Sequence, residues 1–283
     1  MSYENYRPNK TGFLPDVVKN LLIINVIMYV ATILLQSQGL DLIDKLGLHY
    51  LASEKFGVWQ FITYMFMHDI GTPGHISIAH IGMNMFILFM FGPMVENMWG
   101  AKKFLTYYIL TGIGAALTHY AILYFQIHPD IVFLTDYINA SSQSEMNSIL
   151  SAGGGNHSYT KQFIETIAEN HLSPTESIDL ASQFLTQILN APVIIGASGA
   201  IFGILLAYGM LFPNSILYVF LAIPMKAKYA VILFGVLELY MGIAGGDNVA
   251  HFAHLGGLFT GLIIIYFWRY QSRQNRNDFF NRE

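Results

Sequence analysis

The stretch Val193–Phe212, VIIGASGAIFGILLAYGMLF, decides the fold, because its 20 residues include no charged side chain. A helix crosses the roughly 30 Å hydrocarbon core of a bilayer with about 20 apolar residues. The stretch therefore predicts a membrane-spanning helix. It contains a single serine, Ser198, which lies near its beginning.

Composition places the rest of the chain in the same class. Of the 283 residues, 54% are hydrophobic and 11% are charged, whereas a soluble domain carries about 25% charged residues. The sequence therefore predicts an all-α polytopic membrane protein, a bundle of six transmembrane helices. The five further apolar runs of suitable length are Val17–Leu35, His80–Met98, Phe104–Phe125, Tyr229–Ala244 and Val249–Trp268.

The remaining composition excludes several kinds of chemistry. The chain has no cysteine, which excludes disulfides, thiolate metal sites and cysteine nucleophiles. Its net charge of −4 argues against a nucleic-acid partner. We expect no cofactor. A seventh apolar piece, Ile216–Ile223, is too short to span and predicts an interfacial turn or a half-buried loop.

Basic residues set the orientation, because cytoplasmic flanks keep them. With both termini inside, 11 of the 14 basic residues are cytoplasmic, and only Lys45, Lys55 and Lys161 lie outside. We therefore expect a multi-pass protein of a bacterial inner membrane. Residues 1–16 and 269–283 are then cytoplasmic, and residues 17–268 form the membrane domain. The polar start and the lack of a cleavage pattern after Leu35 indicate a retained first span.

Two long segments, residues 37–79 and 126–191, then lie outside. Aromatic and small apolar residues in Phe56–Met67 suit the membrane interface. The second segment opens with Asn139–Thr160, which is rich in Ser, Gly and Asn and predicts a flexible linker. The sequence Ser173-Pro174-Thr175-Glu176 has the pattern of a capping box. It predicts the start of an amphipathic helix over Thr175–Leu189.

Polar residues inside spans are costly and therefore candidates for function. Ser198 and His254 each precede the inner end of their span by 14 residues, which places both roughly 21 Å above it. Asn84 lies at about the same level, and His80 lies one turn nearer the outside. The full set of such residues is Asn25, His80, Asn84, His119, Ser198, Glu238, His251 and His254.

This layer contains the parts of a serine hydrolase. Ser198 is the candidate nucleophile and His254 the general base. The amide of Ser198 and the side chains of His80 and Asn84 are candidate donors to an oxyanion. The pairs Gly199/Gly203 and Gly257/Gly261 allow two helices to approach closely. An extended approach over Pro192–Ala197 is consistent with a pit that admits water.

At these residues the chain resembles the rhomboid family of intramembrane serine proteases. The resemblance rests on several motifs spread over residues 17–268, apart from the long second outside segment. They are Gly196-Ala197-Ser198-Gly199, Ala253-His254-Leu255-Gly256-Gly257 with Gly261, His80-Ile81-Gly82-Met83-Asn84, and more weakly Gly92-Pro93-Met94-Val95-Glu96 and Trp59-Gln60.

The resemblance implies a six-helix bundle that hydrolyses single-pass or polytopic membrane proteins within the lipid bilayer. It implies a Ser198/His254 dyad without a third acidic member, and substrate entry beside the fifth helix under a cap at Gly245–Ala250. Gln60 stands where the family often has an arginine. Phe202 stands where some members have a tyrosine that packs on the histidine, and it keeps the ring but lacks the hydroxyl. The segment between the third and fourth spans is longer than in the shortest members.

Other interpretations stay open at this stage. His251 is an alternative base, and His251 and His254 form a possible metal site with His80, His75 or His68, although no acidic ligand is clearly placed. Glu238, about 6 Å below the serine by helical rise, predicts a structural hydrogen bond. Glu96 predicts a loop cap or a tie to Lys102 or Lys103. The alternative functions are an inactive rhomboid-like binding protein and a histidine-using metal or proton transporter.

Overall fold

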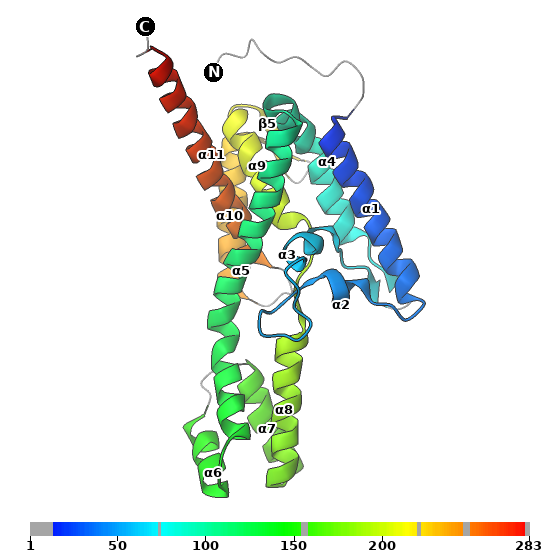
Figure 1. Ribbon diagram of the computed structural model, residues 1–283, viewed down its shortest axis with the longest axis vertical. Coiled ribbons are helices and arrows are strands. Elements are labelled where there is room, and N and C mark those ends of the chain that lie inside the picture. The colour runs from blue at the N-terminus through cyan, green and yellow to red at the C-terminus, as the bar shows by residue number, and fades with distance from the viewer. Residues whose placement is uncertain (1–13, 73–74, 154–157, 220–221, 246–249, 281–283) are drawn as a thin grey trace. The chain divides into compact units, whose positions relative to one another are not determined.

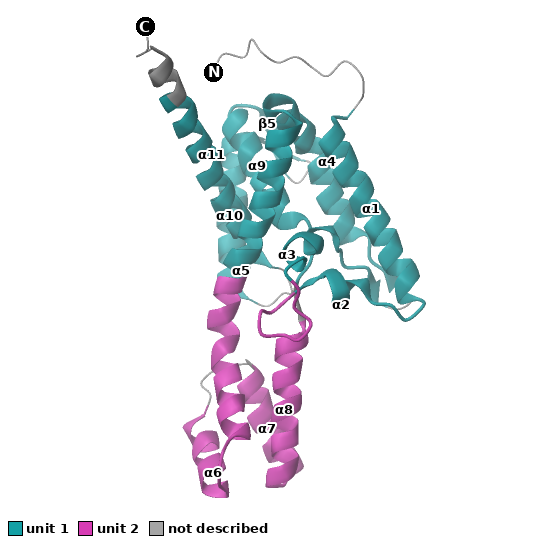
Figure 2. Ribbon diagram, viewed as in Figure 1, with its two compact units in different colours: residues 1–48, 58–119, 194–283 teal, residues 49–57, 120–193 magenta. Residues whose placement is uncertain are grey.

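The computed structural model describes residues 14–72, 75–153, 158–219, 222–245 and 250–280. Most of these residues are helical (Figure 1). The chain divides into two compact units (Figure 2). Unit 1 comprises residues 1–48, 58–119 and 194–283, and unit 2 comprises residues 49–57 and 120–193.

Unit 1 contains the apolar helices, which confirm the all-α membrane fold. Among the described residues, five helices are long and apolar enough to cross a membrane, and α9 is a shorter apolar helix. Helix α1 exposes large apolar side chains, as a helix in contact with lipid does: Ile23, Ile27 and Leu34 are 50–59% exposed. The helices are α1 (Asp16–Gln36), α4 (Ala79–Trp99), α5 (Ala101–Ile138), α9 (Ser198–Leu211), α10 (Ala227–Ala244) and α11 (His251–Phe280).

Helix α9 is shorter than the apolar run that predicted it. The expected helix covers Val193–Phe212, but α9 begins at Ser198 and is preceded by the strand β4 (Pro192–Ile194). Gly196 has φ +112°, a conformation that interrupts a right-handed helix. The extended approach expected over Pro192–Ala197 is therefore present over Pro192–Ile194, whereas Ala197 already has helical backbone angles. The helix itself measures only about 21 Å.

Helix α5 is longer than predicted. Its 38 residues extend for about 57 Å, well past the expected end at Phe125. Pro129 lies inside the helix. The second half of α5 belongs to unit 2.

Unit 2 has a helical core of its own. Its further helices are α6 (Gln143–Ala152), α7 (Ser158–Asn170) and α8 (Pro174–Asn190). The flexible linker predicted over Asn139–Thr160 is therefore wrong where α6 forms, and residues 154–157 lie outside the described part. The capping box of Ser173 and Glu176 is confirmed. The buried side chains of this core are Phe133, Leu134, Tyr137, Met146, Phe163, Ala181 and Ile188.

The elements between the long helices are short. Strands β5 (Ile216–Val219) and β6 (Ile223–Lys226) pair antiparallel, with Ile216 opposite Lys226, where a turn or loop is expected. Strands β2 (Gly71–Thr72) and β3 (His75–Ile76) also pair antiparallel. The remaining elements are α2 (Leu42–Leu46), β1 (Leu48–His49), which forms a two-stranded sheet with β4, α3 (Gln60–Thr63) and the 3₁₀ helix η2 (Tyr64–Phe66).

Glycines bring the helices that hold the site together. A Cβ on Gly257 of α11 would overlap the carbonyl oxygen of Gly199 of α9, which confirms the predicted close approach of these two helices. The glycines also lie close to α5: Gly199 lies against Ala115, Gly203 against Thr111, and Gly261 against Tyr107. Helix α5 is thus a third partner that the glycine pairs do not predict.

Glu96 joins α4 to the start of α1. Its two carboxylate oxygens accept hydrogen bonds from the backbone N–H groups of Val17 at 3.0 Å and Val18 at 2.8 Å. These are two of the four amides that the first turn of a helix leaves unpaired. The prediction that Glu96 serves a loop or a lysine is therefore wrong: it caps another helix.

Candidate active site

Ser198 is placed by the bend that precedes α9. The backbone N–H of Gly196 donates to the carbonyl of Tyr64 at 2.9 Å, which fixes the extended segment to η2. A Cβ on Gly196 would lie 2.7 Å from Nε2 of His80, so glycine is required both for the φ angle and for the space. Ser198 follows as the first residue of α9, among the unpaired amides of a helix N-terminus.

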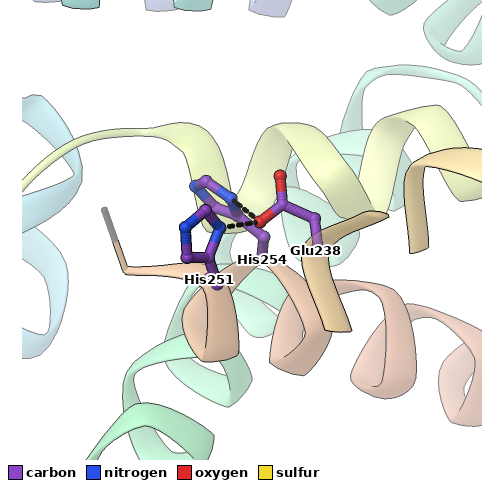
Figure 3. Close-up of side chains that lie close together, drawn as sticks. All are labelled: Glu238, His251 and His254. Atoms are coloured by element: carbon purple, nitrogen blue, oxygen red, sulfur yellow. Dashed lines mark hydrogen bonds and ion pairs between the residues drawn. The ribbon is translucent and has the colours of Figure 1, made fainter. Parts of the chain in front are cut away.

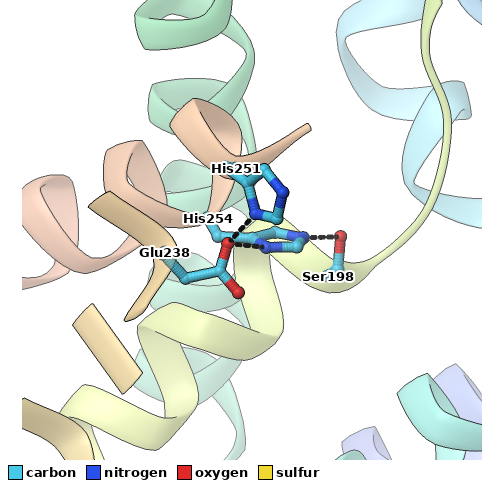
Figure 4. Close-up of polar contacts among 4 residues, drawn as sticks. All are labelled: Ser198, Glu238, His251 and His254. Carbon is cyan, nitrogen blue, oxygen red and sulfur yellow. Dashed lines mark hydrogen bonds and ion pairs between the residues drawn. The ribbon is translucent and has the colours of Figure 1, made fainter. Parts of the chain in front are cut away.

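The hydroxyl of Ser198 meets the imidazole of His254. Nε2 of His254 lies 2.8 Å from Oγ of Ser198 (Figure 4). The flat face of the His254 ring makes an apolar contact, because the ring of Phe202 stacks on it with centroids 4.4 Å apart and planes 6° apart. Phe202, one turn after Ser198, therefore holds the plane of the imidazole while the serine approaches its edge.

A carboxylate lies on the opposite edge of His254. Oε2 of Glu238, on α10, is 2.8 Å from Nδ1 of His254 and 2.7 Å from Nδ1 of His251 (Figure 3). The three side chains are nearly buried, with exposed fractions of 6–11%. The expected hydrogen bond of Glu238 is thus present. The helical rise placed only its backbone below the serine layer; its carboxylate reaches the edge of His254.

His80 presents a donor beside the serine. Nδ1 of His80 accepts a hydrogen bond from the backbone N–H of Asp69 at 3.2 Å, so a neutral ring carries its proton on Nε2. That nitrogen lies next to Gly196. Asn84 is buried on the next turn of α4, and its Nδ2 donates to the carbonyl of His80 at 2.8 Å.

Of the possible metal ligands, His251 and His254 lie together, and Glu238 supplies beside them the acidic group that the sequence did not clearly place. Within the described ranges, the metal-ligand type atoms that gather within 4.8 Å of one another belong to Glu238, His251 and His254. His68 instead packs its ring edge-on against His80, at 5.0 Å between centroids. Burial lowers the pKa of His68 to about 3, and the neighbouring His80 adds to this effect.

The structure describes Gln60 and one end of the cap that the resemblance implies at Gly245–Ala250. Gln60, where an arginine is common, is buried and donates from Nε2 to the carbonyl of Lys45 at 3.3 Å. The cap expected at Gly245–Ala250 includes residues 246–249, which lie outside the described residues. Gly245 ends α10 with φ +65°.

Glu238 is the member of this cluster whose position sequence reasoning missed. The sequence feature that could have located it is its spacing: Glu238 precedes His251 by 13 residues. These two residues lie on consecutive helices, α10 and α11, which are close in the chain. Antiparallel neighbours joined by a short loop bring such positions to one level. Helical rise gives the depth of the backbone alone, whereas helix tilt and the length of the glutamate side chain decide where the carboxylate lies.

Comparison with known families agrees with this architecture. The model of the rhomboid domain matches residues 55–128 and 171–271, which is more than half of the chain. The chain belongs to the rhomboid family. A search of curated proteins finds no match. The matched ranges include Ser198, His254, His80 and Asn84, whereas residues 129–138 of α5 and all of α6 and α7 fall outside them.

Proposed function

We propose that this protein is an intramembrane serine protease, which hydrolyses peptide bonds of transmembrane substrates near the outer face of the membrane. The observation that carries the proposal is the 2.8 Å contact between Oγ of Ser198 and Nε2 of His254. Such a contact lets the imidazole take the hydroxyl proton as the oxygen attacks. Membership of the rhomboid family supports the same chemistry.

The reaction proceeds in two halves. Oγ of Ser198 attacks the carbonyl carbon while its proton moves to Nε2 of His254, and the resulting oxyanion faces the amide of Ser198, His80 and Asn84. The C–N bond then breaks, and the leaving amine takes the proton from Nε2. A water molecule, deprotonated by the same nitrogen, hydrolyses the ester and restores Ser198.

The proposed substrates are single-pass or polytopic membrane proteins. Hydrolysis needs water, and the extended segment before α9 gives the serine a place at a helix end, where access is easiest. The substrate must present an extended strand to Ser198, so we expect cleavage near small, helix-weakening residues. We propose a bacterial inner membrane with both termini cytoplasmic, because the basic residues favour that orientation.

Labelling with a fluorophosphonate probe tests the nucleophile. The parent protein in detergent should label, and Ser198→Ala should not. Ser272→Ala is a matched control, because Ser272 lies on α11 and its hydroxyl donates to the carbonyl of Trp268; this variant should label like the parent. Cleavage of a model transmembrane span should follow the same pattern. A folded parent that neither labels nor cleaves would point to a family member that only binds membrane clients.

A further inference from the structure

Glu238 shares one carboxylate oxygen between two histidines, and the family dyad leaves this group without a role. We infer that Glu238 is the positioning residue of His254, so that the site works as a Ser198–His254–Glu238 relay with His251 holding the carboxylate. The inference rests on the proposed protease function and assigns further residues to it.

The first step concerns the proton on the imidazole. A neutral histidine carries one N–H, and Nε2 of His254 must be bare to accept the proton of Ser198. The N–H therefore belongs on Nδ1, which lies 2.8 Å from Oε2 of Glu238. An ionised carboxylate only accepts hydrogen bonds, so Glu238 stabilises this tautomer and disfavours the inactive one.

The second step concerns what holds Glu238. Nδ1 of His251 lies 2.7 Å from the same oxygen, and it donates a second N–H to it. The rings of the two histidines are nearly perpendicular, at 88°, so the two donors approach the oxygen from different directions (Figure 4). Hydrogen bonds are stronger where water is excluded. The carboxylate is thereby kept in one position, and His251 acts on the base without contacting substrate.

Glu238, His251 and His254 could be joined either by a metal ion or by hydrogen bonds. The same three residues offer donor atoms of the types that zinc accepts. Ligands bound tetrahedrally to zinc at 2.0–2.1 Å lie about 3.3 Å or more from one another. The distances of 2.7 and 2.8 Å from Oε2 to the two nitrogens are hydrogen-bond lengths. The geometry therefore favours protons between these groups.

A positive charge develops on His254 during the reaction. When Nε2 takes the proton of Ser198, His254 becomes a cation beside the Glu238 carboxylate, which stabilises it. The proton on Nδ1 stays on the imidazole, and Glu238 remains ionised throughout. Phe202 fixes the plane of the His254 ring, and Glu238 fixes its rotation within that plane through the contact with Nδ1.

Kinetics of Glu238→Gln in liposomes containing a model transmembrane substrate test the inference. An amide presents an N–H where the carboxylate accepts, which favours the wrong tautomer. We expect kcat to fall about 10²- to 10⁴-fold, with KM changed by less than about threefold, because Glu238 contacts no substrate in this scheme. Glu238→Asp, which keeps the charge, should recover part of the loss. His251→Gln should lower kcat less than Glu238→Gln.

Glu96→Gln is the matched control, because Glu96 is also buried and accepts two N–H groups, but it lies on α4 and its donors belong to the start of α1. Its kcat per folded molecule should equal that of the parent. An unchanged kcat in folded Glu238→Gln would overturn the inference while leaving the protease proposal intact. So would equal losses in Glu238→Gln and Glu238→Asp, because the charge would then play no part.

A second readout does not need activity. In protein labelled with ¹⁵N-histidine, the spectrum of the parent should show His254 protonated on Nδ1 and bare on Nε2, and Glu238→Gln should reverse or mix these states. A parent with the proton on Nε2, or one that holds a stoichiometric metal lost in His251→Gln, would overturn the inference. A parent with the expected tautomer that cleaves nothing would refute the protease proposal alone.

Discussion

The ring of Phe202 lies flat against the imidazole of His254, with planes 6° apart and centroids 4.4 Å apart. The contact comes from α9, the same helix that carries Ser198. One helix therefore supplies both the nucleophile and the surface that orients its base.

Loss of this surface should slow the reaction. Phe202→Leu keeps an apolar side chain but removes the flat face, and an aromatic pair contributes about 0.5–1.5 kcal/mol. We expect kcat to fall up to about tenfold. Phe202→Tyr keeps the ring and should stay within about twofold of the parent. Cleavage rates of a model span, normalised to folded protein, measure the effect, and equal rates in both variants would argue against stacking.

Gly257→Ala should force α9 and α11 apart. The new methyl would overlap the carbonyl oxygen of Gly199, and backbone cannot move aside as a flexible side chain can. Overpacking typically costs 1–3 kcal/mol, and we expect about 3 kcal/mol here, with loss of cleavage. Gly82→Ala is the control, because a Cβ there has nothing within 4 Å, and it should be neutral or stabilising. Thermal unfolding in detergent compares the two.

Removing the carboxylate of Glu96 should weaken the start of α1. Glu96→Ala leaves the amides of Val17 and Val18 unpaired, and we expect a loss of about 1–3 kcal/mol in the free energy of unfolding. Asp16→Asn removes an exposed charge from the same turn and should cost less than about 1 kcal/mol. Unfolding curves of the three proteins measure the difference. Equal stabilities of parent and Glu96→Ala would show that the contact contributes nothing.

Acid should destabilise the fold through His68. Burial lowers its pKa from 6.5 to about 3, so between these pH values the unfolded chain binds a proton that the folded chain does not. The free energy of unfolding therefore falls as pH falls, by about 1.4 kcal/mol per pH unit from this group. The contribution is intact above pH 6.5. His68→Leu should flatten the dependence between pH 7 and 5, whereas His75→Gln, at an exposed position, should leave it unchanged.

Much of the fold and of the candidate site was predictable, because the bilayer simplifies the problem. A span of known thickness turns residue counts into depths, and this placed Ser198 and His254 at one level before any contact was known. Local signals were equally informative where the chemistry is local: the capping box of Ser173 and Glu176 needs only four consecutive residues.

Other features depend on information that a single helix does not contain. The two backbone donors to Glu96 lie 78 and 79 residues away in the sequence. The position of the Glu238 carboxylate depends on the tilt of α10 and on the rotamer of the side chain. Helix α6 forms inside a stretch whose Ser, Gly and Asn content suggested a linker, where Met146 packs into the core of unit 2 and the Ser142 side chain caps the helix.

The shortness of α9 has a consequence for its surroundings. The residues of α9 are buried or half-buried among neighbouring helices, so the difference between a helix of about 21 Å and a hydrocarbon layer of about 30 Å does not bring lipid against it. The backbone of residues 192–196 is not helical, and such backbone is tolerated at membrane depth only where protein buries it or water fills a cavity beside it. Ending the helix early thus obliges the protein to keep this depth polar.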